Sequence, residues 1–501
     1  MASFTHQFDT PVYKGSASID TRLFIDGKFV DPVEGGSIEV VNPTNGKIIT
    51  SVAAGTSKDV DIAVQAARKA YKTSWGLRVP GKARGQILNK IADLIEKHGD
   101  ELAALECLNT GKIYTFTHFR DIPIAVETFR YYAGWADKIH GQTIETDENK
   151  LAYTRHEPYG VVAQIVPWNF PLVCLAAKVA PALATGNVIV FKPSEVTPLT
   201  ALKFASFLNE AGVPPGVVNV INGYGHTVGQ AFSSHPQIEK LAFTGSTLTG
   251  RKILEASART NLKDVTLELG GKSPNIIFDD CDLEQAVKWS TMGIFFNMGQ
   301  VCIAGSRIFV QEGVYERFVG AFQAAAKGFG QAAGDPFAPQ SQHGPQVSKS
   351  HFERIMSYID SGKQEGATVL AGGQQHGDTG YYIEPTLFTD VTPEMKIARE
   401  EIFGPVAVII KFKDEAEVIE MANDTSYGLA CGVFTENTSR ALRVIHALEA
   451  GSAFVNCYST IEVSVPFGGH KQSGIGKESG EAALATYTQV KAVHVNIGMR
   501  L

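Results

Sequence analysis

The fold is decided by Val161-Val162-Ala163-Gln164-Ile165-Val166 and by three similar apolar runs that follow it, at 187–191, 217–220 and 240–243. Short runs of this kind, rich in β-branched residues, predict buried strands. Helical spacing marks the stretches between them, from about Leu172, over 199–211 and over 227–233. Strands that alternate with helices form right-handed βαβ units, so we expect an α/β fold class with a parallel sheet.

The chain is long enough for more than one such unit. Its 501 residues exceed the roughly 250–300 at which a single hydrophobic core stops growing. Helical periodicity marks three earlier stretches, 59–71, 81–98 and 122–136. We therefore expect the first quarter to be mostly helical. A second alternating region runs from Asn275-Ile276-Ile277-Phe278 to about Gly468-Gly469, which places a domain boundary near residue 270.

Composition and charge argue against several classes of protein. Hydrophobic residues make up 44% of the chain and the net charge is −7, without the basic stripe of a nucleic-acid-binding surface. No apolar run approaches the roughly 18–20 residues of a membrane span, and residues 1–20 lack a signal-peptide core. The six cysteines form no CxxC pair and the 13 histidines no HExxH motif. We expect no disulfide framework, no metal site, and a cytoplasmic location.

Polar residues and glycines follow the ends of the four predicted strands. They are Asn169 after the first strand, Lys192 and Glu195 after the second, Gly225 after the third, and Gly245 and Ser246 after the fourth. In open α/β sheets the ligand binds beyond the carboxyl ends of the strands. This clustering predicts a binding site there. Taken alone, Asn169 could cap the helix near Leu172, and the stretch from Lys192 to Glu195 could be a solvated turn.

Two further segments carry groups suited to covalent chemistry. Cys302 lies in the glycine-bounded loop Gly299-Gln300-Val301-Cys302-Ile303-Ala304-Gly305, where a thiol can be a nucleophile or an inert buried residue. Glu268 lies between Leu267 and Leu269, just before Gly270-Gly271. A carboxylate with apolar flanks has a raised pKa and suits a general base, although burial in an ion pair is the alternative.

Together these segments resemble the aldehyde dehydrogenase superfamily, and most closely its NAD-dependent broad-range cytosolic and mitochondrial members. The resemblance runs from about residue 23 to residue 492 and includes Pro167-Trp168-Asn169-Phe170-Pro171, Lys192-Pro193-Ser194-Glu195, Phe243-Thr244-Gly245-Ser246 and Glu401-Ile402-Phe403-Gly404-Pro405. It implies a Rossmann-type NAD-binding domain (1–140 and 159–270) and an α/β catalytic domain (271–475). The remaining segments, 141–158 and 476–501, would form a small β-extension for oligomerisation, giving a homotetramer or homodimer.

The resemblance also implies a division of catalytic roles. Cys302 would attack the aldehyde to give a thiohemiacetal, and loss of hydride to NAD would leave a thioester. Asn169 and the Cys302 backbone N–H would stabilise the alkoxide, and Glu268 would activate the water that hydrolyses the thioester. Lys178 would lie close to Glu268, although from the sequence it could equally be a surface lysine.

Residues for NAD and for the aldehyde follow in the same way. Glu195, supported by Lys192, would accept hydrogen bonds from a ribose diol and repel a 2′-phosphate, which favours NAD over NADP. By resemblance the other cofactor residues are Ile165, Trp168, Gly225, Gly245, Ser246, Glu401 and Phe403. The substrate pocket would be lined by Phe170, Cys174, Ala177, Phe296, Ile461 and Phe467.

The substrate class is predicted from departures within that pocket. Ala177 and Ile461 stand where relatives often have bulkier or aromatic residues, which predicts a wider tunnel that admits bulky aldehydes. The run 459–465 lacks the tryptophan of a quaternary-ammonium cage, which argues against betaine aldehyde and favours uncharged aliphatic or aromatic aldehydes. Glu462, if it faces the entrance, would repel carboxylate-bearing semialdehydes. The alternatives are a thiol esterase or hydrolase, for which no activating histidine is designated, and a specialised semialdehyde or betaine aldehyde dehydrogenase. The presence of Cys302 and Glu268 speaks against a catalytically silent or coenzyme A-acylating relative.

Overall fold

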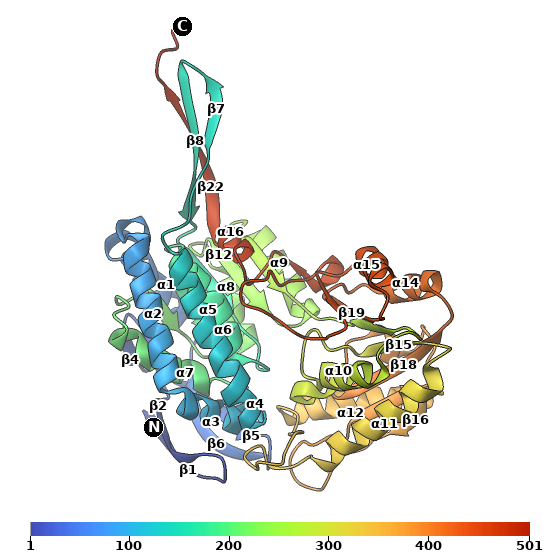
Figure 1. The fold of residues 1–501 in the computed structure, drawn as a ribbon. Coiled ribbons are helices and arrows are strands. Elements are labelled where there is room, and N and C mark those ends of the chain that lie inside the picture. The colour runs from blue at the N-terminus through green and yellow to red at the C-terminus, as the bar shows by residue number, and fades with distance from the viewer. Residues whose placement is uncertain (1) are drawn as a thin grey trace.

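The computed structural model describes residues 2–501 and contains two large sheets (Figure 1). The first has eight strands in the order β21 (Gly474–Ile475), β13 (Asp264–Glu268), β12 (Lys240–Thr244), β9 (Val161–Ile165), β10 (Val188–Lys192), β11 (Val218–Val220), β3 (Leu23–Ile25) and β4 (Lys28–Val30). The central strands from β13 to β11 are parallel, and the edge strands β21, β3 and β4 pair antiparallel. The α/β class and the four predicted strands are confirmed.

The register of the parallel strands brings their carboxyl ends into line. Ile165, at the end of β9, pairs with Lys192 of β10 and with Phe243 of β12. Thr244 pairs in turn with Glu268, the last residue of β13. Residues that follow these strands therefore emerge at one edge of the sheet.

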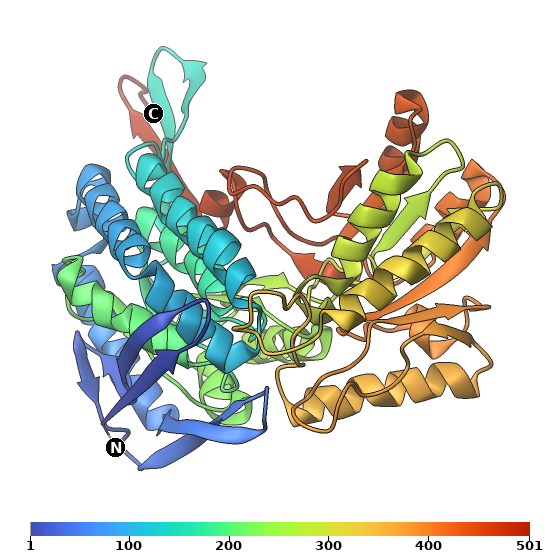
Figure 2. The same ribbon diagram turned by 60° about the horizontal axis from the view of Figure 1, so that its bottom comes forward.

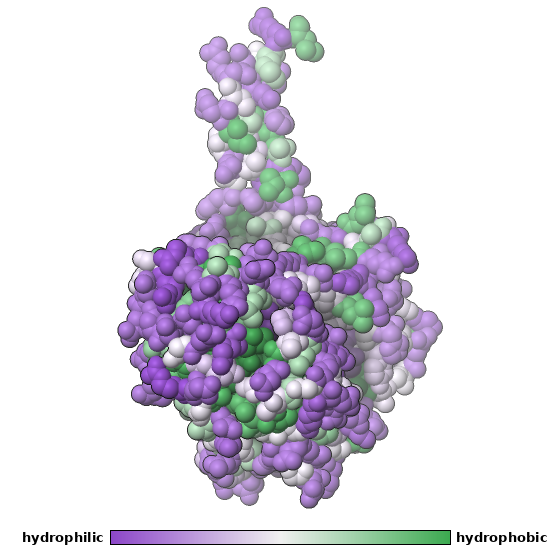
Figure 3. All heavy atoms as spheres, turned by 90° about the vertical axis from the view of Figure 1, so that its right-hand side faces the viewer, coloured by the Kyte–Doolittle hydropathy of each residue, from purple (hydrophilic) through white to green (hydrophobic). Residues whose placement is uncertain are grey.

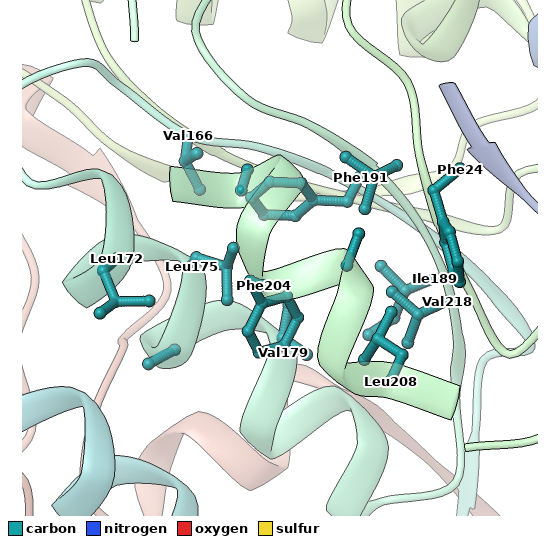
Figure 4. Packing of buried hydrophobic residues seen from close by; sticks show 14 of the residues in the cluster. Phe24, Val166, Leu172, Leu175, Val179, Ile189, Phe191, Phe204, Leu208 and Val218 are labelled. Carbon is teal, nitrogen blue, oxygen red and sulfur yellow. The ribbon is translucent and has the colours of Figure 1, made fainter. Parts of the chain in front are cut away.

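Helices cover both faces of this sheet. They are α1 (Ser57–Thr73), α2 (Gly81–Lys97), α3 (Gly99–Thr110), α4 (Tyr114–Phe116), α5 (Ile122–Trp135), α6 (Pro171–Ala184), α7 (Leu199–Glu210), α8 (Gln230–Ser234) and α9 (Thr247–Arg259). Figure 4 shows side chains of α6 and α7, among them Val179 and Phe204, packed with Phe191 of β10. Burial of these apolar side chains holds the helices against the strands.

The N-terminal region differs from the expected helical first quarter. Before α1 the chain forms β1 (Ser3–Asp9), β2 (Lys14–Asp20), β3, β4, β5 (Gly36–Asn42) and β6 (Lys47–Ala54). Figure 2 shows these strands in dark blue beside the helices that follow. β1 pairs with β2 and β5 with β6, both antiparallel. The expectation is wrong for this part because it rested on the helical periodicity found after residue 57.

The second sheet has seven strands. Their order is β16 (Thr368–Ala371), β17 (Thr386–Thr389), β18 (Val406–Phe412), β15 (Arg307–Gln311), β14 (Pro274–Ile277), β19 (Ala430–Phe434) and β20 (Ser452–Val455), and only β16 pairs antiparallel. Its helices are α10 (Leu283–Phe295), α11 (Tyr315–Gln331), α12 (Lys349–Gln364), α13 (Lys396–Arg399), α14 (Glu415–Asn423) and α15 (Thr438–Ala447). Ile308 and Val310 of β15 join one hydrophobic cluster and Phe309 joins another, because alternate side chains point to opposite faces.

The chain leaves the first sheet after β13, enters the second at β14, and returns to the first at β21. A short helix, α16 (Ala482–Thr486), then leads into β22 (Thr488–Asn496). β22 pairs antiparallel with β8 (Lys150–Pro158), which pairs with β7 (Thr143–Asp147). These three strands project from the body as a stalk, at the top of Figure 1. No helix within residues 2–501 combines the length and the apolar character needed to cross a membrane.

Candidate active site

A cavity of about 330 Å³ lies at the carboxyl edge of the first sheet. Thirteen of the residues predicted from the sequence line it: Trp168, Asn169, Phe170, Cys174, Ala177, Gly245, Ser246, Glu268, Cys302, Glu401, Phe403, Ile461 and Phe467. Segments up to about 300 positions apart thus meet around one space. A cavity of this size suits a small organic molecule.

The other predicted residues lie outside the lining. Phe296 is buried behind Phe170, with 6.2 Å between the ring centroids. Lys178 is fully buried on α6. The last four, Ile165, Lys192, Glu195 and Gly225, lie at or after the ends of β9, β10 and β11.

The loop that carries Cys302 has an unusual backbone. Asn297, Met298 and Gly299 have φ angles of 48°, 56° and 73°, in the left-handed region that non-glycine residues rarely adopt. A Cβ on Gly299 would lie 2.1 Å from the carbonyl oxygen of Gly404, so only glycine fits there. Strained backbone of this kind persists where the surrounding structure holds it, often at functional sites.

The Cys302 thiol and the Glu268 carboxyl both line the cavity, near enough for each to shift the pKa of the other. Burial, reinforced by Glu268, raises the pKa of the Cys302 thiol well above its ordinary value. Burial, together with the nearby charge of Glu478, raises the pKa of Glu268 to about 8. This agrees with the raised pKa expected from the apolar flanks of Glu268. In this state the thiol is the weaker acid of the two, so its proton moves to Glu268 only against a free-energy cost, and the proximity of the two groups gives that transfer a route.

Asn169 is held against the cysteine loop. Its Nδ2 donates a hydrogen bond of 2.9 Å to the carbonyl oxygen of Gln300, two residues before Cys302. The helix α6 begins at Pro171, and its N-cap residue, Phe170, makes no side-chain cap. The capping role considered for Asn169 is therefore wrong. Its amide instead points toward the segment that positions the thiol.

Glu478 is a site residue that the sequence did not reveal. It lines the cavity, forms an ion pair with Lys178, and accepts a 3.4 Å hydrogen bond from the Thr244 hydroxyl. Its backbone forms a two-way bridge with Phe467, with both hydrogen bonds at 2.7 Å. No local motif surrounds Glu478, and Lys178 lies 300 positions away, so only the folded chain identifies the pair.

A second polar group lies at the end of β10. The Lys192 Nζ donates a hydrogen bond of 2.9 Å to Glu195. Although burial opposes ionisation of Glu195, Lys192 and backbone N–H groups, including that of Gly225, hold its pKa below the ordinary value. Helix α9 follows β12 and begins after Ser246. The Ser246 hydroxyl accepts a hydrogen bond from Thr249 N. The fixed anion of Glu195 and the N-terminus of α9 suit a diol and a phosphate, respectively.

Glu401 and Phe403 also line the cavity. Glu401 accepts a 2.9 Å hydrogen bond from Gly271 N, and burial raises its pKa to about 7. A Cβ on Gly270 would lie 2.3 Å from Glu401 Oε2, so this approach requires glycine. Phe403 has a φ of 63°, and its ring meets that of Trp168 edge-on at 5.2 Å. Two aromatic rings and a carboxyl group thus form one wall.

The chain is similar in sequence and in structure to known proteins. The sequence pattern described as "Aldehyde dehydrogenase family" matches residues 29–493. An aldehyde dehydrogenase of Agaricus bisporus is 59% identical over 498 residues, which cover 99% of each chain. Aldehyde dehydrogenase 1A1 of Gallus gallus is 50% identical and covers 95% of this chain and 94% of its own. The solved NAD+ complex of an aldehyde dehydrogenase from Bacillus cereus is 48% identical, with a TM-score of 0.94 over 95% of this chain and 96% of that one.

Proposed function

The chain belongs to the aldehyde dehydrogenase family, and on that premise we propose that Cys302 and Glu268 catalyse its reaction through a covalent intermediate. The reaction is the NAD-dependent oxidation of an aldehyde to a carboxylic acid. The observation that carries the proposal is that Cys302 and Glu268, from separate segments, line the same cavity and shift each other's pKa. We propose the division into an NAD-binding part and a catalytic part near residue 270 on the same basis, since the chain changes sheets there.

Proton transfer from Cys302 to ionised Glu268 produces the nucleophile. The thiolate then attacks the carbonyl carbon, and the carbonyl oxygen becomes an alkoxide. Asn169 Nδ2, which lies beside the cysteine loop, donates to this oxygen together with the Cys302 N–H. Groups fixed by the fold need not reorganise as the charge develops, which lowers the barrier.

The cofactor is held by residues on both sides of the thiol. Glu195 and Lys192 bind the ribose hydroxyls, and the ionised Glu195 disfavours a 2′-phosphate. The N-terminus of α9 at Gly245 and Ser246 receives the pyrophosphate, and Glu401 and Phe403 border the nicotinamide end. The remaining proposed cofactor-binding residues lie at or after the ends of β9 and β11: Ile165, Trp168 and Gly225. The chemistry that NAD supplies when bound is acceptance of the hydride that leaves the adduct.

A thioester then remains on Cys302 and must be hydrolysed. Glu268 takes a proton from the attacking water, since its pKa of about 8 lies close to the working pH. Glu478 and Lys178, which form an ion pair, act on this carboxyl in opposite directions. The charge of Glu478 raises the pKa of Glu268, and the charge of Lys178 lowers it. Both halves of the reaction therefore depend on the ionised form of Glu268.

The hydrocarbon part of the aldehyde contacts the remaining wall. Ala177 lines the cavity, where its small side chain leaves room for bulky substrates, together with Phe170, Cys174, Ile461 and Phe467. Phe296 supports Phe170 from behind. Glu462 does not line the cavity, so the expected repulsion of carboxylate-bearing substrates loses its basis.

Assembly and location are proposed on separate grounds. The stalk carries exposed apolar side chains, among them Ile144, Leu151 and Val490, within a hydrophilic surface (Figure 3). β22 and β7 each have one unpaired edge. Exposed edges and apolar patches favour association, so we propose a homotetramer or homodimer built through the stalk, to be tested by light scattering. Six free cysteines favour the reducing cytoplasm.

Replacement of the nucleophile tests the mechanism. Cys302→Ser should abolish aldehyde-dependent NADH formation, because a serine hydroxyl is not ionised near neutral pH, while NAD binding measured by calorimetry survives. Cys457→Ser is the matched control, since Cys457 lies outside the cavity lining. Full turnover in Cys302→Ser, or an equal loss in Cys457→Ser, would exclude Cys302 as the nucleophile. Ester hydrolysis without any NADH formation in the unmodified protein would instead indicate a thiol esterase.

A further inference from the structure

We propose that Arg120 makes one wall of the active-site cavity a carboxylate subsite. The preferred substrates would then be aldehydes that carry a carboxylate at the end remote from the carbonyl group. This inference rests on the proposed function, because it assigns the far end of the same substrate. It replaces the expected preference for uncharged aldehydes, because the argument against carboxylate-bearing substrates depended on Glu462, which does not line the cavity.

Arg120 reaches the cavity from an irregular turn. Residues Thr117–Asp121 form a single π-helical turn, η2, between α4 and α5, and both Arg120 and Asp121 line the cavity. Isolated π-helical turns are uncommon and are frequently found at functional sites. The extra residue in the turn changes which side chains of this helical segment face the cavity.

The guanidinium of Arg120 has no carboxylate partner among residues 2–501. Asp121 is the one carboxylate close enough to act on its charge, and Asp121 is itself paired with the buried Lys112. Lys112 also binds Glu106, with 3.1 Å between Nζ and Oε1. Lys112 is thus shared by two carboxylates, and within residues 2–501 Arg120 makes no direct ion pair with either of them.

The hydrogen-bonding capacity of Arg120 is also largely unused. Its one hydrogen bond within residues 2–501 is a long contact of 3.4 Å from Nη2 to the carbonyl oxygen of Ser459. A guanidinium has five N–H donors. Arg354, the other arginine in the lining, has two acceptors, the carbonyl oxygen of Glu401 at 3.2 Å and the hydroxyl of Tyr358 at 3.4 Å.

The surroundings of Arg120 favour a planar anion. Its guanidinium carbon lies 4.3 Å from the centroid of the Phe296 ring. This cation–π contact holds the guanidinium N–H donors in a fixed orientation. The lining from the same part of the chain also includes Ile124, Thr128 and Asp121, whose carboxylate is held by Lys112. A carboxylate matches the guanidinium fork with two parallel hydrogen bonds, and their strength increases where water is scarce.

The subsite is separate from the reacting centre. Arg120 comes from η2 and its guanidinium packs on Phe296, whereas Glu268 ends β13. Within residues 2–501 no hydrogen bond or ion pair joins Arg120 to Glu268 or to Cys302. A substrate that spans both would place its aldehyde at Cys302 and its second polar group at Arg120. The product of such a substrate is a dicarboxylate.

A pair of probe aldehydes of similar size tests the subsite. We would measure kcat/KM for 4-carboxybenzaldehyde and 4-methylbenzaldehyde in the unmodified enzyme, Arg120→Met, Arg120→Lys and Arg130→Met. Comparing each variant with the unmodified enzyme cancels the different intrinsic reactivities of the two aldehydes. Arg130 is an exposed arginine on α5, outside the cavity, and serves as the control.

Arg120→Met should lower the ratio of kcat/KM for the carboxylate over the methyl probe by about tenfold or more, mainly through KM, as for a lost charge-assisted hydrogen bond. Arg120→Lys should restore part of the ratio, and Arg130→Met should leave it unchanged. A decrease of less than about fivefold in Arg120→Met, or an equal decrease in Arg130→Met, would overturn the proposal.

Binding without turnover separates the subsite from the catalytic proposal. In calorimetry with the unmodified protein, terephthalate should bind at least about fivefold more tightly than 4-methylbenzoate, because only terephthalate offers a second carboxylate. Equal affinities would overturn the subsite even if Arg120→Met did not fold. Oxidation of neither aldehyde, with terephthalate still preferred, would count against the proposed function and leave the subsite standing.

Discussion

The pH dependence of turnover should report the environment of Glu268. Its carboxyl has a pKa of about 8, chiefly because burial disfavours the charged form. A carboxylate acts as a base only when it is ionised, so activity should rise with pH through this pKa. With a pKa of about 8, the ionised fraction is about 9% at pH 7 and about 91% at pH 9. The value of kcat for thioester hydrolysis should therefore increase about tenfold over this interval.

Replacing Glu478 should move this profile in a defined direction. The charge of Glu478 raises the pKa of Glu268, so Glu478→Gln removes a repulsion and should shift the midpoint to lower pH. The glutamine can still accept a hydrogen bond from Lys178, but the lysine loses its ionic partner. Because Lys178 is fully buried, we also expect reduced stability, which thermal unfolding would measure.

The assay is steady-state NADH formation at saturating NAD and aldehyde from pH 6 to pH 10, with the first-turnover burst recorded separately. The burst shows whether thioester hydrolysis limits kcat at each pH. Glu462→Gln is the matched control, because Glu462 is exposed and lies outside the cavity lining. A kcat that does not change between pH 7 and pH 9 would refute the raised pKa of Glu268. A midpoint of the kcat profile that is the same in Glu478→Gln would refute the contribution of Glu478 to that pKa.

Three further substitutions test separate parts of the site. Glu268→Gln should reduce steady-state turnover by at least about 100-fold, as for loss of a general base, while a first-turnover burst of NADH persists; unchanged turnover would exclude Glu268 as the base. Glu195→Gln should weaken the preference for NAD over NADP, measured as the ratio of kcat/KM values, because the repulsion of a 2′-phosphate is lost; equal use of both cofactors by the unmodified enzyme would refute this. Ala177→Trp should lower kcat/KM for bulky aldehydes more than for acetaldehyde, and an unchanged ratio would show that residue 177 does not limit the pocket.

Local patterns determined much of the first sheet. The runs at 161–166, 187–191, 217–220 and 240–243 predicted β9 to β12 to within a few residues, because a buried parallel strand needs a short, continuous apolar segment. The helical stretches at 59–71, 81–98 and 122–136 likewise correspond to α1, α2 and α5. The strand-end rule then grouped residues such as Asn169 and Gly245 before any distance was known.

The same reasoning failed where the local signal was weak. The strands of the two hairpins before Ser57 have seven or eight residues, but their exposure is mixed and they lack a continuous apolar run, so helical periodicity further along the chain dominated the expectation. Glu462 looked relevant because it lies in a segment that borders the pocket, yet its own side chain does not line the cavity. Proximity along the chain does not determine which way a loop side chain points.

By itself, then, the sequence determined the α/β architecture, and through its resemblance to a known family it designated the proposed thiol, base and ribose-binding pair. Only the tertiary structure decided that Glu478 pairs with Lys178 and that Arg120 lacks a carboxylate partner. These facts depend on contacts between segments as far as 300 positions apart and on how completely water is excluded from them. Charge pairing and burial are properties of the packed chain, so no local pattern encodes them.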